Sequence, residues 1–230
     1  IEIKIKILSI KIKVYQKFFT KPTATWTHPD YSPQAYGGKL VPQMIGEKFS
    51  YPKSIFAVFD CVDLFLPEDG IVLDFFGGSG TTGHATQLLN QRDEDLFNAF
   101  VSKYGKDFPL SQEFLLTDAK LFAPFDVTNK DNSPLTEDEL IEKWTAWYHN
   151  HGKRSFIVCT NNEIEDLEPD KLFTNWRNGK TFKQLTPSKQ KEELNHPDGI
   201  CRKITFPRLK QITEGFDSSD DLALKIQEIR

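Results

Sequence analysis

The chain has 230 residues, of which 38% are hydrophobic and 27% charged, and its formal net charge is -4. A chain of this size can bury the core of one domain with additions, and its composition fits a soluble globular protein. The acidic balance excludes a uniformly basic nucleic-acid binder, although a local basic face is still possible.

The cysteines and the apolar segments indicate where the protein works. Cys61, Cys159 and Cys201 stand apart with no C-x-x-C spacing. This pattern favours reduced thiols in a cytoplasmic protein and predicts no metal site. No apolar stretch approaches the roughly 20 residues of a membrane-spanning helix, and no signal peptide is visible, so we expect no membrane association.

The first residues predict a strand and then an extended segment. Residues 1–15 alternate isoleucine with lysine or glutamate, which is typical of an amphipathic strand. An edge strand whose lysines discourage aggregation is favoured over a ribbon that contacts DNA. Residues 21–39 are rich in proline, glycine and aromatic residues and predict an extended connection with turns. Because the chain begins at Ile1 and contains one methionine, Met44, we expect it to be a fragment.

A helix, a strand and a second helix follow in the next part of the chain. Residues 49–66 predict a helix that starts after Pro52. Residues 70–76 form an apolar run that predicts a parallel strand covered on both faces. Residues 82–91 predict the second helix. The side chains expected to face inward are Ile55, Val58, Phe59, Val62 and Phe65 in the first helix and Ala85, Leu88 and Leu89 in the second.

Residues 91–153 separate this helix from the next predicted strand, which is more than an ordinary connection needs. They predict a small helical insertion. Its last helix would be capped by Ser133 or Thr136 and would bury three large side chains, Leu140, Trp144 and Trp147. We interpret these aromatic residues as core, in preference to a stacking platform.

The C-terminal part predicts one further strand and several helical segments. Residues 154–163 predict a strand that ends in polar residues. Residues 167–198 are charged and predict helix in parts, whereas 201–215 predict a short strand or a turn, followed by a helix. Residues 220–230 predict an amphipathic helix.

A glycine-rich turn lies between the strand at 70–76 and the helix that follows it. In α/β proteins this arrangement places backbone amides and a helix N-terminus next to a ligand. Gly78, Gly80 and Gly83 fit the pattern G-x-G-x-x-G, which is weak evidence by itself. No lysine directly precedes the hydroxyl residues of the turn, which excludes a phosphate-binding P-loop.

A dinucleotide site is a second interpretation of the same turn. Such a site needs an acidic residue about 20 residues further on, at the end of a second strand. Asp93, Glu94 and Asp95 lie near that distance, but no strand is predicted before them. Glu163 ends a strand, but only after the insertion. A tight turn without a ligand is the remaining alternative.

Four segments together carry a resemblance to a known family. Residues 74–85, DFFGGSGTTGHA, resemble the S-adenosylmethionine (AdoMet) motif of β-class amino-group DNA methyltransferases, in particular the modification subunits of type III restriction-modification systems. Residues 49–53, FSYPK, resemble the family's tenth motif, with Ser54 in place of a second proline. Residues 154–163 are similar to the second cofactor strand, and 201–208 to the segment that follows.

The resemblance implies an α/β, Rossmann-like AdoMet-dependent methyltransferase fold that is incomplete in this chain and carries a helical insertion. Residues 49–90 and 154–215 would form the AdoMet-binding core, and 91–153 the insertion. Residues 1–48 would be an N-terminal strand and extended connection at the end of the target-recognition region. Residues 216–230 would form a C-terminal helix.

The resemblance also implies a cofactor site. The loop amides and hydroxyls would hold the AdoMet carboxylate, Asp74 the ammonium group and Glu163 the ribose, whereas the two phenylalanines would lie near the sulfonium or adenine. Lys53 would add positive charge and Phe49 would pack on the cofactor. The implied cofactor-binding residues are Phe49, Lys53, Asp74, Phe75, Phe76, Gly77, Gly78, Ser79, Gly80, Thr81, Thr82 and Glu163.

Some of these roles have simpler alternatives. Asp74 could only cap the turn, Glu163 could be a solvated strand end, and Lys53 could be a surface lysine. We interpret His84 as a residue on a helix face and not as a catalytic base.

The family's catalytic motif, a polar or acidic residue followed by Pro-Pro and an aromatic residue, is not found in this sequence. The nearest string, at 28–31, has one proline. We therefore expect no catalytic residue here and an inactive chain, whereas the complete protein would methylate adenine N6 in double-stranded DNA as a homodimer with a restriction subunit. The alternatives are a non-catalytic partner module that binds AdoMet or DNA, and a dinucleotide-dependent oxidoreductase.

Overall fold

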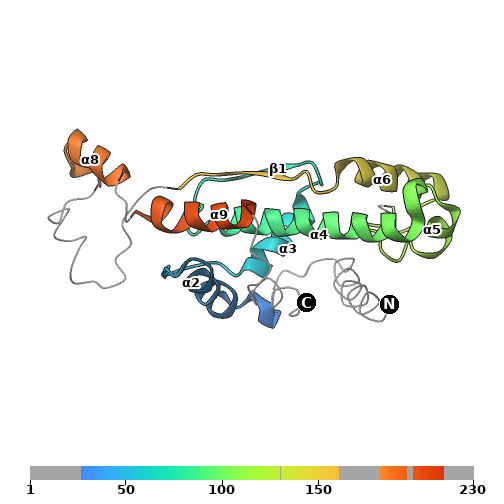
Figure 1. Cartoon of the computed structure of the whole chain (residues 1–230), viewed down its shortest axis with the longest axis horizontal. Coiled ribbons are helices and arrows are strands. Elements are labelled where there is room, and N and C mark those ends of the chain that lie inside the picture. Colours follow the sequence, from blue (N-terminus) through green and yellow to red (C-terminus); the bar gives the residue numbers. More distant parts are fainter. Residues whose placement is uncertain (1–26, 130, 161–181, 196–198, 215–230) are drawn as a thin grey trace. The chain divides into compact units, whose positions relative to one another are not determined.

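A computed structural model describes residues 27–129, 131–160, 182–195 and 199–214 of the chain (Figure 1). The chain divides into two compact units. The described part of the first unit, here called the inserted unit, is residues 90–129 and 131–153. The second, here called the core unit, combines residues 27–89 with the described residues from Arg154 onward.

The core unit begins with helical turns where an extended connection was predicted. The turns are η1 (Pro29–Tyr31), η2 (Gln34–Gly38) and α2 (Leu40–Ile45). The prediction of an extended connection is therefore wrong for these residues. Pro29 stands at the start of η1 and Pro33 directly before η2, where a proline removes no helical hydrogen bond.

Helix α3 (Ile55–Phe65) confirms the helix predicted after Pro52. Three side chains of the predicted inner face are buried, namely Ile55, Phe59 and Val62. The prediction for Phe65 is wrong, because this side chain is 81% exposed. Phe65 is the last helical residue, and the extended backbone of the C-cap residue Leu66 ends the helix there.

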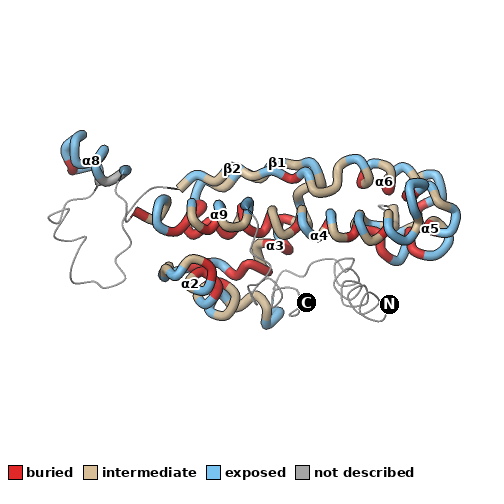
Figure 2. The backbone as a smooth tube through the Cα atoms, in the orientation of Figure 1, coloured by how far each residue is buried: buried red, intermediate tan, exposed pale blue. Residues whose placement is uncertain are grey.

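Strands β1 (Ile71–Asp74) and β2 (Ser155–Val158) form a parallel pair, in which Ile71 lies opposite Ser155 and Asp74 opposite Val158. The parallel pairing confirms the prediction of a parallel strand. The prediction that both faces of this strand are buried is wrong. Exposed and half-buried residues alternate along both strands (Figure 2). An apolar run in a sequence is compatible with a strand that is buried on both faces, but it does not identify the elements that would cover those faces.

Helix α4 (Thr81–Tyr104) confirms the helix predicted at 82–91 and continues for 24 residues in total. Ala85 and Leu89 are buried as expected, and Leu88 is half-buried. The part of α4 up to Leu89 belongs to the core unit, and the part from Asn90 to the inserted unit.

The rest of the core unit is helical where the structure describes it. η4 (Phe182–Gln184) and α8 (Pro187–Leu194) lie in the charged stretch that was predicted to be partly helical. η5 (Cys201–Thr205) and α9 (Phe206–Thr213) resolve the alternatives for 201–215 in favour of helix, without a strand in this segment.

The inserted unit contains η3 (Gly105–Asp107), α5 (Gln112–Thr117) and α6 (Glu137–Asn150). Thr136 caps α6 in a capping box with Glu139, so Thr136 and not Ser133 is the cap.

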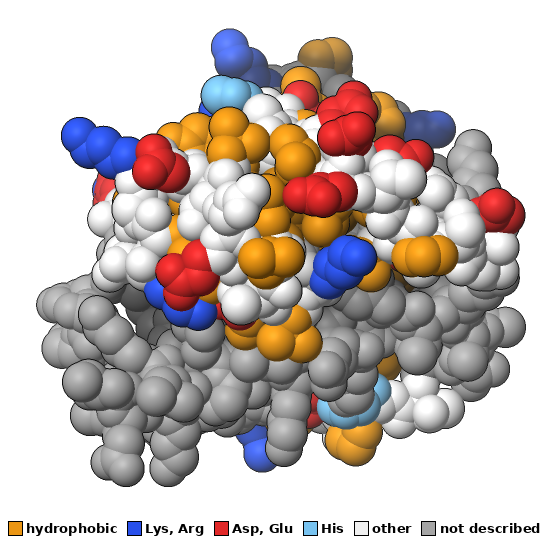
Figure 3. Space-filling view, turned by 90° about the vertical axis from the view of Figure 1, so that its right-hand side faces the viewer, with side chains coloured by type: hydrophobic (Ala, Val, Ile, Leu, Met, Phe, Trp, Pro, Cys, Tyr) orange, Lys and Arg blue, Asp and Glu red, His pale blue; other side chains and the backbone are white. Residues whose placement is uncertain are grey.

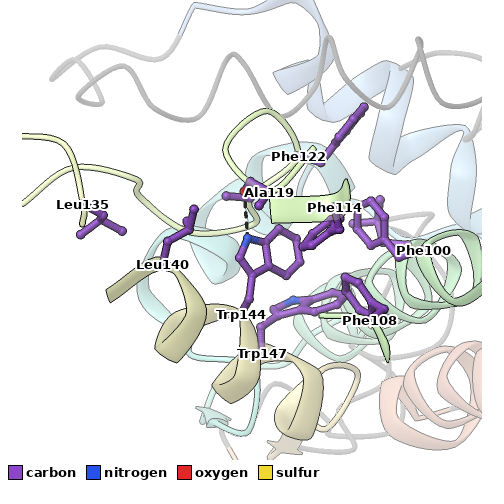
Figure 4. Close-up of a cluster of buried hydrophobic side chains, with 11 residues drawn as sticks. Phe100, Phe108, Phe114, Ala119, Phe122, Leu135, Leu140, Trp144 and Trp147 are labelled. Carbon is purple, nitrogen blue, oxygen red and sulfur yellow. Dashed lines mark hydrogen bonds between the residues drawn. The ribbon is translucent and has the colours of Figure 1, made fainter. Parts of the chain in front are cut away.

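The core of the inserted unit is a cluster of aromatic side chains (Figure 4). Trp144 is fully buried at its centre, and its Nε1 donates a hydrogen bond to Ala119 O at 2.8 Å. Trp147 and Leu140 are buried as predicted. The aromatic residues are therefore core, and the stacking-platform alternative is wrong for Trp144 and Trp147.

The face shown in Figure 3 carries apolar side chains interspersed with acidic and basic ones. In the inserted unit, the large apolar side chains that remain exposed are Leu110, Leu116 and Leu121. These three residues lie in or beside α5, outside the aromatic cluster.

Several predictions concern residues outside the described ranges. They are the strand at 1–15, the end of the strand at 161–163 with Glu163, and the helices within 167–181 and 216–230. The division into domains stays a prediction.

Candidate functional site

The turn from β1 to α4 is the candidate site. Asp74 ends β1 and Thr81 begins α4. Gly78 and Gly80 between them have φ angles of +48° and +79°, in the left-handed region that favours glycine. The turn thus needs glycine at two positions for its backbone conformation alone.

The start of the turn is fixed to the end of β2 by backbone hydrogen bonds. Cys159 N donates to Asp74 O at 2.7 Å, and Gly77 N donates to Cys159 O at 3.0 Å. A Cβ atom at Gly77 would overlap Val158 Cγ1. Gly77 is therefore required by the close approach of β2 and not by a positive φ.

Asp74 organises the turn through both carboxylate oxygens. Its Oδ1 accepts a hydrogen bond from Phe76 N at 2.9 Å, and its Oδ2 accepts one from Thr82 Oγ1 at 2.7 Å. Asp74 is thus a turn cap, as one of the alternatives proposed. An ionised carboxylate has about four acceptor positions, so this role leaves capacity for a ligand's ammonium group.

Some amides of the turn are used within the turn and others are not. Gly80 N donates to Gly77 O at 2.7 Å, and His84 N donates to Gly80 O at 3.1 Å. Other amides have no main-chain acceptor among the residues that the structure describes: those of Gly78, Ser79, Thr81 and Thr82. Free amides at a glycine turn and a helix N-terminus are suited to an anion such as a carboxylate.

A buried arginine of α9 lies against this turn. Arg208 is 0% exposed. Its Nη1 donates to Ser79 O at 3.1 Å, to Ser79 Oγ at 3.0 Å and to Thr81 Oγ1 at 3.1 Å. The hydroxyls of Ser79 and Thr81 are 3.1 Å apart. These two side chains, predicted to hold a ligand carboxylate, therefore have a protein partner in this structure.

His84 completes this buried network. Its Nδ1 lies 3.3 Å from Arg208 Nε and 3.1 Å from Arg208 Nη2. Burial, and secondly the charge of Arg208, hold the pKa of His84 well below its usual range. Burial lowers the pKa of Arg208 to about 10. At neutral pH His84 is therefore neutral and accepts from Arg208, which stays positively charged.

Two neighbours of Arg208 also pack on the turn (Figure 1, where α9 lies beside the start of α4). Thr205 Oγ1 donates to Gly78 O at 2.5 Å. A Cβ atom at Gly83 would lie 2.6 Å from Leu209 Cδ2. Sequence reasoning singled out neither Thr205 nor Arg208. Both lie in the segment 201–208 that resembles the family, and they are three residues apart in a helix, but neither signal identifies the segment they contact.

Phe49, from the predicted tenth motif, lies against the turn. A Cβ atom at Gly78 would lie 3.4 Å from Phe49 Cζ. Lys53 is exposed, and so are Phe75 and Phe76, at 64% and 94%. The structure therefore places Phe49 next to Gly78, which lies 29 residues further along the chain. The remaining predicted binding residue, Glu163, lies outside the described ranges.

The described ranges contain no group of three or more His, Cys, Asp or Glu side chains placed to hold a metal ion. None of their helices combines the length and the hydropathy of a membrane span.

Comparison with known proteins defines the class. Residues 3–122 match the N6/N4 DNA methylase family, and this match covers the candidate turn and Phe49. Because it extends over more than half of the 230 residues, the chain belongs to this family of DNA methylases.

The chain is also similar to subunits of particular restriction-modification enzymes. It is 36% identical over 78 residues to the type III EcoPI Mod subunit of Escherichia phage P1, covering 34% of this chain and 12% of that protein. It is 31% identical over 127 residues to the type III EcoP15I Mod subunit of Escherichia coli, covering 48% of this chain and 20% of that protein. It is 41% identical over 58 residues to the type III StyLTI Mod subunit of Salmonella typhimurium, covering 25% of this chain and 9% of that protein.

The matches thus span at most a fifth of the length of these three relatives. No solved structure matches the chain.

Proposed function

We propose that this chain is the AdoMet-binding part of a site-specific DNA adenine-N6 methyltransferase of a type III restriction-modification system. The observation that carries the proposal is the turn after β1, whose amides at Gly78, Ser79, Thr81 and Thr82 lack main-chain acceptors among the described residues. The similarity to three type III Mod subunits supports the system to which we assign it.

The residues of the turn fit the amino acid end of AdoMet. The free amides and the N-terminus of α4 are suited to its carboxylate, and Asp74 has acceptor capacity for its ammonium group. Phe49 lies against Gly78, and exposed Phe75 and Phe76 offer aromatic surface to a sulfonium cation. Bound AdoMet would supply an electrophilic methyl group for transfer to an amine.

The chain's own residues would bind and orient the cofactor and would not carry out the transfer. Adenine must leave the duplex before its amine can be methylated, and a separate group must hold the flipped base. In the string most similar to the family's catalytic motif, His28 to Tyr31, Pro29–Tyr31 instead forms η1 with His28 as its N-cap, and Tyr31 Oη donates to buried Asp60 at 2.5 Å. We therefore propose that this chain alone does not methylate DNA.

The dinucleotide alternative loses support from the position of its acidic residues. Asp93, Glu94 and Asp95 lie within α4 and not at the end of a strand, where a ribose would be bound. Asp93 is also fully buried and paired with Arg92. The non-catalytic partner module stays an alternative, because it would use the same cofactor site.

Isothermal titration of the 230-residue chain with AdoMet, sinefungin and NAD tests the proposal. We expect saturable binding of AdoMet and sinefungin, which share the amino acid end, and none of NAD. Binding of NAD without AdoMet would overturn the assignment.

Variants of the turn make this test specific. Asp74→Ala and Gly78→Asp should abolish AdoMet binding, because one removes the turn cap and the other places a carboxylate among the amides. Asp69→Ala, at an exposed residue of the turn before β1, is the control for loss of an acidic side chain. Gly46→Ala is the control for backbone strain, because Gly46 has a φ of +74° and no neighbour within 4 Å of an added Cβ.

In the complete protein we propose double-stranded DNA as the substrate and a homodimer with a restriction subunit as the assembly. A methylation assay on DNA, with the intact modification protein and with this chain, separates an enzyme fragment from a partner module. We expect the intact protein to methylate DNA and Asp74→Ala to abolish this activity. Intact protein that binds AdoMet but methylates no DNA would favour the partner module.

A further inference from the structure

Arg208 carries a buried positive charge without an acidic partner. Its guanidinium is 0% exposed, and its hydrogen-bond partners are a carbonyl, two hydroxyls and the His84 ring. No carboxylate forms an ion pair with it in the part of the chain that the structure describes. A buried charge is normally paired because desolvation opposes it, so this arrangement points to an anion supplied from outside the protein.

The charge lies directly behind the amides of the candidate turn. Arg208 Nη1 donates to both the carbonyl and the hydroxyl of Ser79. The Ser79 amide, on the same residue, has no main-chain acceptor among the described residues. An anion held by this amide would therefore lie close enough to the guanidinium for the attraction to be only weakly screened.

Thr205 determines the direction in which the same amide points. A trans peptide is planar, with its C=O and N–H on opposite sides. Thr205 Oγ1 donates to Gly78 O, so the N–H of that peptide, which belongs to Ser79, points away from η5. The hydroxyl of Thr205 and the guanidinium of Arg208 thus hold two consecutive peptide groups of the turn.

We infer that Thr205 and Arg208 are positioning residues for the anionic end of the ligand: they orient the Ser79 amide and place an unpaired positive charge behind it. This inference rests on the proposed function and adds a partner for the carboxylate of AdoMet. Neither residue touches the ligand, and neither takes part in methyl transfer.

The proposed role concerns the carboxylate of AdoMet and not the rest of the cofactor, so a pair of ligands with and without this group can test it. 5′-Methylthioadenosine contains the adenosine and sulfur of AdoMet but lacks the amino acid end. A positioning role at the carboxylate predicts that variants lose affinity for AdoMet and keep affinity for 5′-methylthioadenosine. A merely structural role predicts that both ligands are weakened equally.

We would titrate both ligands into the full chain and into paired variants. Arg208→Met removes the charge and keeps an unbranched apolar stem, whereas Arg208→Lys keeps the charge. Thr205→Val removes the hydroxyl and keeps the shape, whereas Thr205→Ser keeps the hydroxyl. Circular dichroism shows whether Arg208→Met folds. If it does not, the two Thr205 variants provide the test.

We expect Arg208→Met and Thr205→Val each to weaken AdoMet about tenfold or more and 5′-methylthioadenosine less than about twofold, with Arg208→Lys and Thr205→Ser restoring much of the loss. Equal weakening of both ligands, or unchanged AdoMet affinity in folded variants, would overturn the inference and leave the proposed function intact. No AdoMet binding by the unaltered chain would overturn the proposed function and this inference with it.

Discussion

Thr82 Oγ1 donates a 2.7 Å hydrogen bond to Asp74 Oδ2, which ties the first turn of α4 to the last residue of β1. The other oxygen of Asp74 accepts from Phe76 N. The carboxylate therefore has a fixed orientation before any ligand arrives.

Removing the Thr82 hydroxyl should weaken AdoMet binding through Asp74. A hydrogen bond to a charged group is worth roughly 1.5–3 kcal/mol, but Phe76 N still holds the carboxylate, so we expect Thr82→Val to weaken binding only about fivefold. Thr82→Ser retains the hydroxyl and is the matched control. Titration calorimetry measures both, and equal affinities for the two variants would contradict an orienting role.

A side chain at Gly77 should destabilise the contact between the turn and β2. Gly77→Ala would bring Cβ into Val158 Cγ1, and such overpacking reduces the free energy of unfolding by roughly 1–3 kcal/mol. Val158→Ala removes the methyl group in the way, so the double variant should be more stable than the sum of the single effects predicts. Urea unfolding of all four proteins measures the coupling, and strict additivity would argue against this contact.

His84 should make the chain less stable at acid pH. Its folded pKa lies below the usual 6.5, so the unfolded chain binds a proton first as the pH falls below about 6.5. The free energy of unfolding should therefore be highest above this pH and decrease by up to about 1.4 kcal/mol per pH unit below it, until the folded pKa is reached.

His84→Asn provides the control for this pH dependence. The amide oxygen of asparagine can accept from Arg208 as Nδ1 does, but it does not titrate near neutral pH. We expect the difference in stability between pH 7 and pH 5, measured by urea unfolding, to be smaller in His84→Asn. An unchanged difference would assign the acid sensitivity to other groups.

The capping box of α6 should contribute measurably to the inserted unit. Thr136→Ala removes the acceptor for Glu139 N and should reduce the free energy of unfolding by about 1 kcal/mol. Glu142→Ala, at an exposed position of the same helix, should change it by less than about 0.5 kcal/mol. Thermal unfolding followed by near-ultraviolet circular dichroism, which reports on Trp144 and Trp147, distinguishes the two variants.

Local patterns in the sequence predicted the longer helices α3, α4 and α6. The period of apolar residues predicted the burial of Leu140, Trp144 and Trp147, because a helix that packs on a core must place them on one face. The same reasoning was wrong for Phe65 and for the faces of β1, because exposure there depends on what lies opposite. The helical turns after Pro29 and Pro33 were missed, since prolines are compatible with a helix start as well as with a loop.

The candidate site, like the fold, could be predicted only in part from the sequence. The glycine turn after β1 was predicted from adjacent residues, and the structure gives it the left-handed conformations that glycine allows. The network behind it joins Ser79 to Arg208 across 129 positions, and no periodicity within either segment indicates that pairing. The role of each predicted binding residue stays a prediction that the titrations above can test.

The two-stranded sheet has a practical consequence for all of these measurements. Ile71, Leu73 and Ile157 are 64%, 49% and 52% exposed, and the described part of the chain adds no third strand to β1 or β2. An apolar ribbon with unpaired edges favours intermolecular strand addition and aggregation. At calorimetric concentrations we therefore expect this chain to self-associate through the ribbon, and light scattering should accompany each titration.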